Sequence, residues 1–193
     1  WTVVMNNDVI CAKGWLRKLL EGARQHKLQI ASPAMVEGDL NYDFDSWTAE
    51  AAQKMQGYSR HGAPHAVCMA IDDSVWQEMG YFMPVPKLLG YEDAIFFQRA
   101  LEDNIRTGTI GDAWLHHYGM TTQKALKLEM NLEQSDSLGN RNLMKLYMNQ
   151  SWWARKLARH ARRKLLRETR AYELASFGMT VHAVRMAENF NWY

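Results

Sequence analysis

The sequence predicts an α/β fold in which helices pack on a sheet, followed by a basic helical tail. Two apolar runs, residues 2–5 and 66–71, have the length of strands. Other segments repeat their apolar residues at the 3.6-residue period of amphipathic helices. Lys and Arg cluster near the C-terminus and set the tail apart in composition. We therefore expect one globular unit over residues 1–130 and a basic amphipathic helical tail over residues 131–193.

The first strand leads into a helix expected over residues 12–26. The apolar face of this helix is made by Trp15, Leu16, Leu19, Leu20 and Ala23. Residues 28–31 are then expected to form a short strand that Ser32-Pro33 closes, because proline is a strong breaker of regular structure. A loop rich in Asp, Asn and Gly leads to a second helix over residues 46–56.

The next stretch alternates strand and helix signals again. Residues 66–71 are continuously apolar, which is typical of a strand buried on both faces. Asp73 or Ser74 is expected to cap a short helix that ends before Gly80. Residues 81–90 lack periodicity and are expected to form a loop leading to a helix over residues 92–103. A strand at residues 113–115 follows and ends in His116-His117-Tyr118-Gly119.

Two short acidic signatures lie where α/β proteins place their ligands. Asn6-Asn7-Asp8 directly follows the first strand, and open α/β sheets bind ligands beyond the carboxyl ends of strands. Glu92-Asp93 opens a helix later in the chain. Both have structural alternatives, because Asn and Asp stabilise turns and acidic residues in a first helical turn complement the helix dipole. His61 and His65 flank a loop that lines either an acceptor cleft or solvent.

Four elements in this order resemble glycosyltransferase family 2, whose members use nucleotide sugars. Asn6-Asn7-Asp8-Val9 resembles the D-x-D motif with Asn in place of the first Asp, and residues 68–82 are similar to the strand and helix of the family. Glu92-Asp93 falls where the family carries its E-D pair, and His117-Tyr118-Gly119 resembles its H-x-G element. The resemblance covers residues 2–125. The family's nucleotide-binding first half has no counterpart in this chain, which therefore resembles the acceptor-side half.

The resemblance implies a GT-A-like mixed sheet flanked by helices and an inverting, metal-dependent glycosyltransferase. Such an enzyme moves a hexosyl or related unit from a nucleotide-diphosphate donor to a glycan, a lipid-linked acceptor or another hydroxyl, as in polysaccharide biosynthesis. Asn6, Asn7 and Asp8 would form the cofactor-binding segment. The ligands of Mn²⁺ or Mg²⁺ would be Asp8, Asn6 and His117.

The chemistry of sugar transfer explains why these residue types are needed. The departing diphosphate gains negative charge, which a divalent cation held by oxygen ligands stabilises. The acceptor hydroxyl must also lose a proton, which a carboxylate within hydrogen-bond reach can take as general base. We assign that role to Asp93 and expect Glu92 to orient the acceptor or to serve the structure.

The tail carries a second, independent signal. Eight Lys or Arg and one acidic residue, Glu168, lie between Arg155 and Arg170, and Trp153, Leu157, Ala161 and Leu165 recur at four-residue spacing. A basic amphipathic helix of this kind favours peripheral membrane contact through residues 152–170. The alternatives are packing on its own domain or on a second copy in a homo-oligomer. A non-catalytic interaction module that binds membranes or a partner is therefore the second function class.

Composition narrows the remaining options. The 23 basic and 21 acidic residues leave a net charge of +2, and no groove-reading motif accompanies the basic cluster, so nucleic acid is not an expected partner. Two cysteines, Cys11 and Cys68, cannot make a disulfide framework. No signal-peptide pattern and no run of about eighteen apolar residues is present. We expect a cytoplasmic location, either free or peripheral at the inner face of the membrane.

Overall fold

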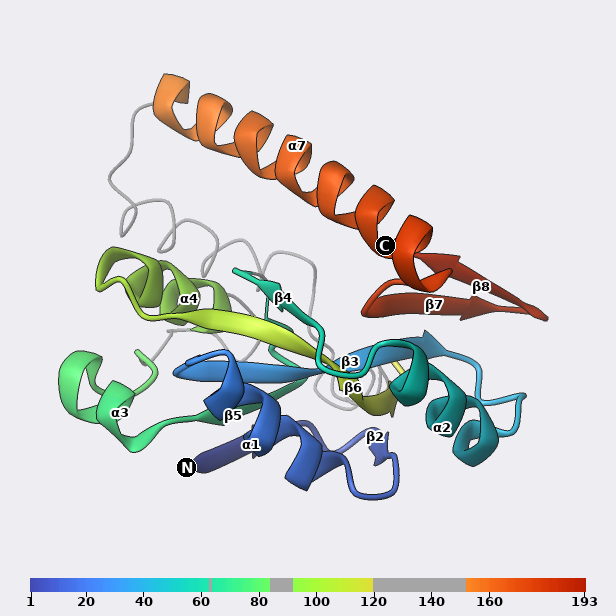
Figure 1. The fold of residues 1–193 in the computed structure, drawn as a ribbon. Helices are drawn as coiled ribbons and strands as arrows, with labels where there is room; N and C mark the ends of the chain where they lie inside the picture. Colours follow the sequence, from blue (N-terminus) through green and yellow to red (C-terminus); the bar gives the residue numbers. More distant parts are fainter. Residues whose placement is uncertain (63, 84–91, 120–151) are drawn as a thin grey trace, which may run out of the picture.

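The computed structural model describes residues 1–62, 64–83, 92–119 and 152–193, which form one curled sheet with helices against it (Figure 1). Its elements, in chain order, are β1 (Thr2–Met5), β2 (Val9–Cys11), α1 (Trp15–Gln25), β3 (Ile30–Gly38), α2 (Phe44–Lys54), β4 (Ser59–His61), β5 (Cys68–Ile71), α3 (Asp73–Met79), α4 (Glu92–Glu102), β6 (Thr107–His117), α7 (Trp152–Phe177), β7 (His182–Met186) and β8 (Asn189–Trp192).

The sheet is mixed and is built around two long parallel strands, β3 and β6. Strand β5 runs antiparallel to the start of β3 and carries β1 on its other side. Strand β7 pairs with the second half of β3, and β8 pairs with β7. On the far side of β6, β4 pairs with its first half and β2 with its last residues. The expected α/β architecture with a mixed sheet flanked by helices is therefore confirmed.

The helices bury their apolar faces in separate clusters along this sheet. Leu19 and Ala23 of α1 pack with Ile110 of β6 and are fully buried. Phe96 and Ala100 of α4 pack with residues of β3 and β5. Burial of each large apolar side chain contributes about 1.5–3 kcal/mol. The periodicity of the sequence thus identified helices whose apolar stripe is bound to the sheet.

Helix positions agree with the sequence prediction, with small differences at their ends. The predicted helix over residues 12–26 is α1, although Leu16 of its expected apolar face is 41% exposed. The predicted cap of α3 was wrong by one residue, because Asp72 accepts the hydrogen bond from the backbone N–H of Ser74 at 2.9 Å. Asp43 caps α2 by accepting from the backbone N–H of Ser46 at 3.1 Å.

The strand lengths were predicted less well. The strand expected to close at Ser32-Pro33 continues to Gly38, and its register against β6 shifts between Pro33 and Ala34. This irregularity accommodates a residue that has no backbone N–H to donate. The strand expected at residues 113–115 is likewise only part of β6. Gly108 lies near the start of β6, and glycine is uncommon inside strands. A Cβ at this position would lie 2.9 Å from the carbonyl oxygen of Arg60 in β4, so the close pairing of β4 with β6 favours glycine.

The C-terminal region is a helix followed by a return to the sheet. The expected basic helix is α7, whereas β7 and β8 were not predicted and belong to the sheet. Val181 and Ala183 are fully buried there. The expected loop over residues 81–90 lies mostly outside the described residues, as does the expected tail before residue 152.

Candidate functional site

The two candidate metal ligands meet because the chain crosses the end of the sheet after β1. Strands β1 and β2 occupy opposite ends of the order β1-β5-β3-β6-β2, and the turn at residues 6–8 connects them. Val9 pairs with His117, and the backbone N–H of Tyr118 donates to the carbonyl oxygen of Asp8 at 3.1 Å. As a result, Oδ1 of Asp8 lies 3.3 Å from Nε2 of His117.

Further polar side chains extend this contact into a histidine–carboxylate cluster of Asp8, Glu37, His65, His117 and His182. Glu37 pairs in register with His117, and its Oε1 lies 3.1 Å from Nδ1 of that ring. Its Oε2 lies 3.2 Å from Nε2 of His182 at the start of β7. The rings of His182 and His65 are in contact, with 4.9 Å between their centroids. Three strands and two connections thus contribute to one linear network.

Hydrogen bonds within this cluster favour the charged forms of Glu37 and His117. Hydrogen bonds from His117 and His182 hold the pKa of Glu37 well below its usual range. The hydrogen bond to Glu37 raises the pKa of His117, against the opposing effect of burial. The side chains of His117 and Asp8 are only 9% and 12% exposed, so solvent screens their interaction weakly. Each ring nitrogen of His117 therefore faces a carboxylate oxygen, Nδ1 that of Glu37 and Nε2 that of Asp8.

His65 behaves oppositely. Its Nε2 atom is buried and has no hydrogen-bond partner among the described residues. Burial lowers the pKa of this imidazole to about 3, so the ring is neutral at physiological pH. Its backbone N–H donates to Oγ of Ser32 at 2.9 Å, which fixes the loop before β5. His61, the other loop histidine, is exposed.

Asp8 and His117 are spaced as two ligands of one cation would be. The 3.3 Å between Asp8 Oδ1 and His117 Nε2 is close to the roughly 3 Å that separates neighbouring ligands around one octahedral ion. Within the described ranges, no group of three or more His, Cys, Asp or Glu side chains is arranged to hold a metal. Such two-ligand sites leave the remaining positions to water and substrate phosphate oxygens, as magnesium sites commonly do.

The asparagines of the predicted motif lie beside this pair. Asn6 and Asn7 are exposed in the turn between β1 and β2. The backbone N–H of Asn6 donates to the carbonyl oxygen of Val67 at 2.9 Å, which ties the turn to the start of β5. In the described part of the chain, no hydrogen bond joins the Asn6 side chain to Asp8 or His117. Its proposed role as a ligand stays a prediction.

The predicted catalytic pair begins α4. Asp93 accepts a hydrogen bond from the backbone N–H of Ala94 at 2.7 Å, and Oε2 of Glu92 is buried without a partner among the described residues. No hydrogen bond or ion pair between described residues joins Asp93 to the cluster. The structure thus brings Asp8 and His117 together and leaves Asp93 out of contact with them.

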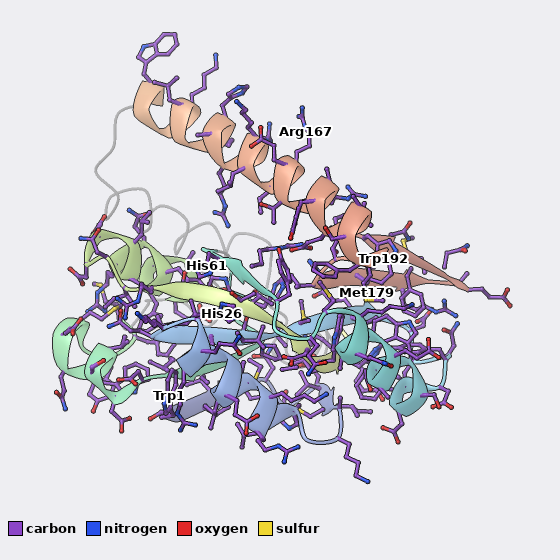
Figure 2. All side chains as sticks on the ribbon, viewed as in Figure 1. Trp1, His26, His61, Arg167, Met179 and Trp192 are labelled. Atoms are coloured by element: carbon purple, nitrogen blue, oxygen red, sulfur yellow. The ribbon has the colours of Figure 1, made fainter. Side chains whose placement is uncertain are left out.

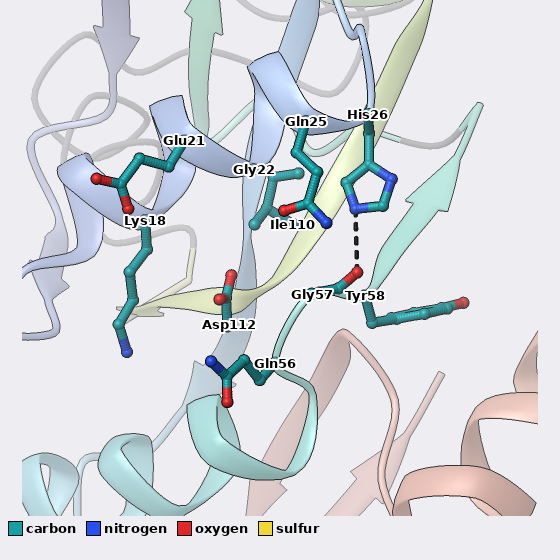
Figure 3. A pocket seen from close by; sticks show the side chains of 10 residues that line it. All are labelled: Lys18, Glu21, Gly22, Gln25, His26, Gln56, Gly57, Tyr58, Ile110 and Asp112. Carbon is teal, nitrogen blue, oxygen red and sulfur yellow. Dashed lines mark hydrogen bonds between the residues drawn. The ribbon is translucent and has the colours of Figure 1, made fainter.

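Two pockets lie elsewhere, between α1 and α2. One has a volume of about 300 Å³, and its lining includes His26, Tyr58 and Asp112 (Figure 3). The other, of about 440 Å³, also contains Lys18 and Asp112. Burial raises the pKa of Asp112, which lies where the register of β6 shifts. Neither pocket contains a residue of the histidine–carboxylate cluster. The cluster is therefore the better candidate for chemistry.

Sequence reasoning missed Glu37 and His182 as site residues. Glu37 fell in a predicted loop because the strand was expected to end at Pro33, and His182 lay in a segment without an expected element. Beyond the proline, Met35 and Glu37 lie on one side of the strand and Val36 on the other. This alternation is the sequence signal that could have predicted the longer strand. The position of His182 depends on the pairing of β7 with β3, which the residues around His182 do not predict.

Known proteins give no assignment for this chain. A scan of family models, a search of curated proteins and a search of solved structures each found no match. The candidate site therefore consists of residues that the fold gathers from distant parts of the sequence, namely Asp8, Glu37, His117 and His182, with His65 beside them.

Proposed function

We propose that this chain is a metal-dependent, inverting glycosyltransferase. The enzyme would transfer a sugar from a nucleotide-diphosphate donor to a hydroxyl of a glycan or lipid-linked acceptor. The single observation that carries the proposal is the 3.3 Å contact between Asp8 and His117, which are far apart in the sequence. In the resemblance to glycosyltransferase family 2, Asp8 matches the D-x-D metal motif and His117 matches the H-x-G element.

Each residue has a distinct task in this proposal. Asp8 and His117 would hold Mn²⁺ or Mg²⁺, which neutralises charge on the departing diphosphate. Glu37 is a positioning residue, because it accepts from Nδ1 of His117 and so fixes the ring with Nε2 directed at Asp8. Asp93 would accept the proton of the acceptor hydroxyl as that oxygen attacks the anomeric carbon. Attack from the face opposite the diphosphate inverts the anomeric centre.

Substitution of Asp8 tests the metal site without requiring turnover. We expect Asp8→Ala to weaken Mn²⁺ binding by the full chain and to remove metal-dependent binding of nucleoside diphosphates, measured by calorimetry. Asp112→Asn is the matched control, because Asp112 is a half-buried acidic residue on the same sheet outside the cluster. Unchanged Mn²⁺ affinity in Asp8→Ala would overturn the proposed metal site.

Substitution of Asp93 tests the base separately. Asp93→Asn should abolish transfer in an assay with donor and acceptor while leaving donor binding nearly intact, because the amide cannot take a proton. Full activity of Asp93→Asn would show that another group is the base. It would leave the metal site standing, since that site is tested by binding.

The exposed helix α7 favours a second candidate function, a non-catalytic module that binds membranes or a partner. A thermal-shift experiment with Mn²⁺ and uridine, guanosine or thymidine diphosphate distinguishes the two. A manganese-dependent rise in melting temperature with any of them supports the transferase. No shift with all three, together with binding to anionic vesicles, supports the interaction module.

A further inference from the structure

Helix α7 is attached to the sheet at its C-terminal end and extends away from it. Glu173 is fully buried and accepts hydrogen bonds from Oη of Tyr58 at 2.8 Å, Nε of Arg60 at 2.7 Å and the backbone N–H of Val181 at 3.2 Å. Nearer the N-terminus of the helix, every described side chain between residues 156 and 168 is exposed. Figure 2 shows these side chains, Arg167 among them, surrounding the part of the helix that rises from the sheet.

The exposed part of α7 is amphipathic. At about 100° per residue, Leu157, Ala161 and Leu165 fall within a sector of about 80°. Leu157 and Leu165 are 69% and 59% exposed, so this stripe is not buried against the sheet. The opposite sector holds four arginines, Arg159, Arg163, Arg167 and Arg170. The helix thus presents a mainly apolar stripe, interrupted by the exposed pair Lys164 and Glu168, and a basic face on the opposite side.

Charge is distributed very unevenly along the chain. Eight of the 23 basic residues but only one of the 21 acidic residues lie between Arg155 and Arg170, so this segment carries +7 and the rest of the chain carries −5. A net charge of +2 hides this separation. An anionic surface would attract the helix and repel the body, which sets a direction of approach.

We propose that the exposed face of α7 binds the surface of an anionic lipid bilayer. The apolar stripe would enter the boundary between headgroups and acyl chains, and the basic side chains would meet the lipid charges. A helix is about 10 Å wide, which is about one Debye length at physiological salt, so even arginines on its far side feel the membrane charge. None of the described helices is long and apolar enough to cross a membrane, so this contact is peripheral.

The apolar stripe decides between a lipid surface and other polyanions. Nucleic acid would be attracted by the arginines, but it offers no apolar phase for Leu157 and Leu165. A second copy of the chain would bring a basic helix toward another basic helix. A bilayer provides both negative charge and an apolar layer along the exposed segment. The inference goes beyond the proposed sugar transfer and does not depend on it.

Vesicle binding by the full chain tests this inference. Co-sedimentation would be measured with phosphatidylcholine vesicles that contain or lack phosphatidylglycerol. We expect binding to the anionic vesicles that falls as salt is raised. The double variant L157S/L165S keeps every charge and should weaken binding by about tenfold or more, because it removes the inserted groups. R159E/R163E should also weaken binding by at least about tenfold.

Matched variants on other helices complete the design. L16S/L101S changes two exposed leucines, and R17E/R24E reverses two exposed charges on α1, so both should leave vesicle binding unchanged. Far-ultraviolet circular dichroism would show that each variant stays folded. Equal binding of wild type and L157S/L165S, with competition by duplex RNA, would overturn the inference in favour of a polyanion site. Loss of self-association in L157S/L165S without any vesicle binding by the wild type would also overturn it, in favour of a second copy.

Discussion

Among single residues, Glu37 controls both the charge and the orientation of His117. Its carboxylate bridges His117 at 3.1 Å and His182 at 3.2 Å, and it raises the pKa of His117. Glu37→Gln keeps the shape but removes the negative charge, so the ring loses its fixed tautomer. We expect Mn²⁺ affinity to fall by about 10-fold to 100-fold, the usual effect of losing such a supporting carboxylate. A calorimetric titration at constant pH measures it.

The control for this prediction is Glu21→Gln, which removes an exposed carboxylate from α1 and should not change Mn²⁺ affinity. Equal affinities of Glu37→Gln and wild type would show that Glu37 does not support the metal site. The proposed ligands Asp8 and His117 would then stand without it.

His65 makes stability dependent on pH. Burial lowers its pKa from 6.5 to about 3, so between these values the unfolded chain takes up a proton that the folded chain does not. The free energy of unfolding therefore falls as the pH drops below 6.5, and this contribution amounts to at most about 2 kcal/mol at pH 5. His65→Gln should remove this part of the pH dependence. Urea denaturation at pH 7 and pH 5 measures the difference.

The exposed histidine His61 supplies the comparison for this experiment. His61→Gln should leave the difference in stability between pH 7 and pH 5 as it is in the wild type. If His65→Gln and wild type lose equal stability on acidification, His65 is not buried as a neutral ring.

At the scale of elements, the buried pair of Glu173 and Arg60 joins α7 to β4. Glu173 is fully buried, and the side chain of Arg60 is 7% exposed. Glu173→Ala leaves a buried guanidinium without its partner, so we expect the free energy of unfolding to fall by about 3–5 kcal/mol. The double variant Arg60→Met, Glu173→Leu should recover most of this loss because neither charge remains. Chemical denaturation of the three proteins measures the coupling.

Glu168 provides a control on the same helix. It is exposed and its Oε1 lies 3.9 Å from Nζ of Lys164, so Glu168→Ala should cost less than about 0.5 kcal/mol. A similar loss for Glu168→Ala and Glu173→Ala would mean that the buried pair does not explain the effect.

The elements also show what the sequence can predict. Helices α1, α2 and α4 were predictable because each carries a complete apolar stripe, a signal that depends only on local spacing. Strand β3 was not, because Pro33 signals an end and only the shifted register of β6 makes its continuation favourable. Since Glu37 lies beyond Pro33, the same error hid the residue that connects His117 to His182.

The residues of the candidate site likewise differ in whether the sequence could predict them. Asp8 and His117 were predictable because each belongs to a short motif at a strand end, and the order of motifs along the chain suggested that they meet. His182 was not predictable, because its place depends on β7 pairing with β3 across most of the chain. Residues 84–91, which precede the predicted base Asp93, lie outside the described residues.

For the molecule as a whole, the outer edge of β1 is the feature most open to association. Among the described residues β1 pairs only with β5, and its residues Val3 and Met5 are 38% and 47% exposed. Edge strands with exposed apolar side chains template pairing with another chain unless a charge interrupts them. We therefore expect the 193-residue chain to self-associate as its concentration rises. Val3→Lys should weaken this association because it places a charge on the edge.

Sedimentation velocity over a concentration series measures the association of the wild type and of Val3→Lys. Leu101→Lys, which changes a 71% exposed leucine on α4, is the control that should leave the association unchanged. A wild-type chain that stays monomeric throughout, or an equal effect of both lysines, would mean that this edge does not drive association.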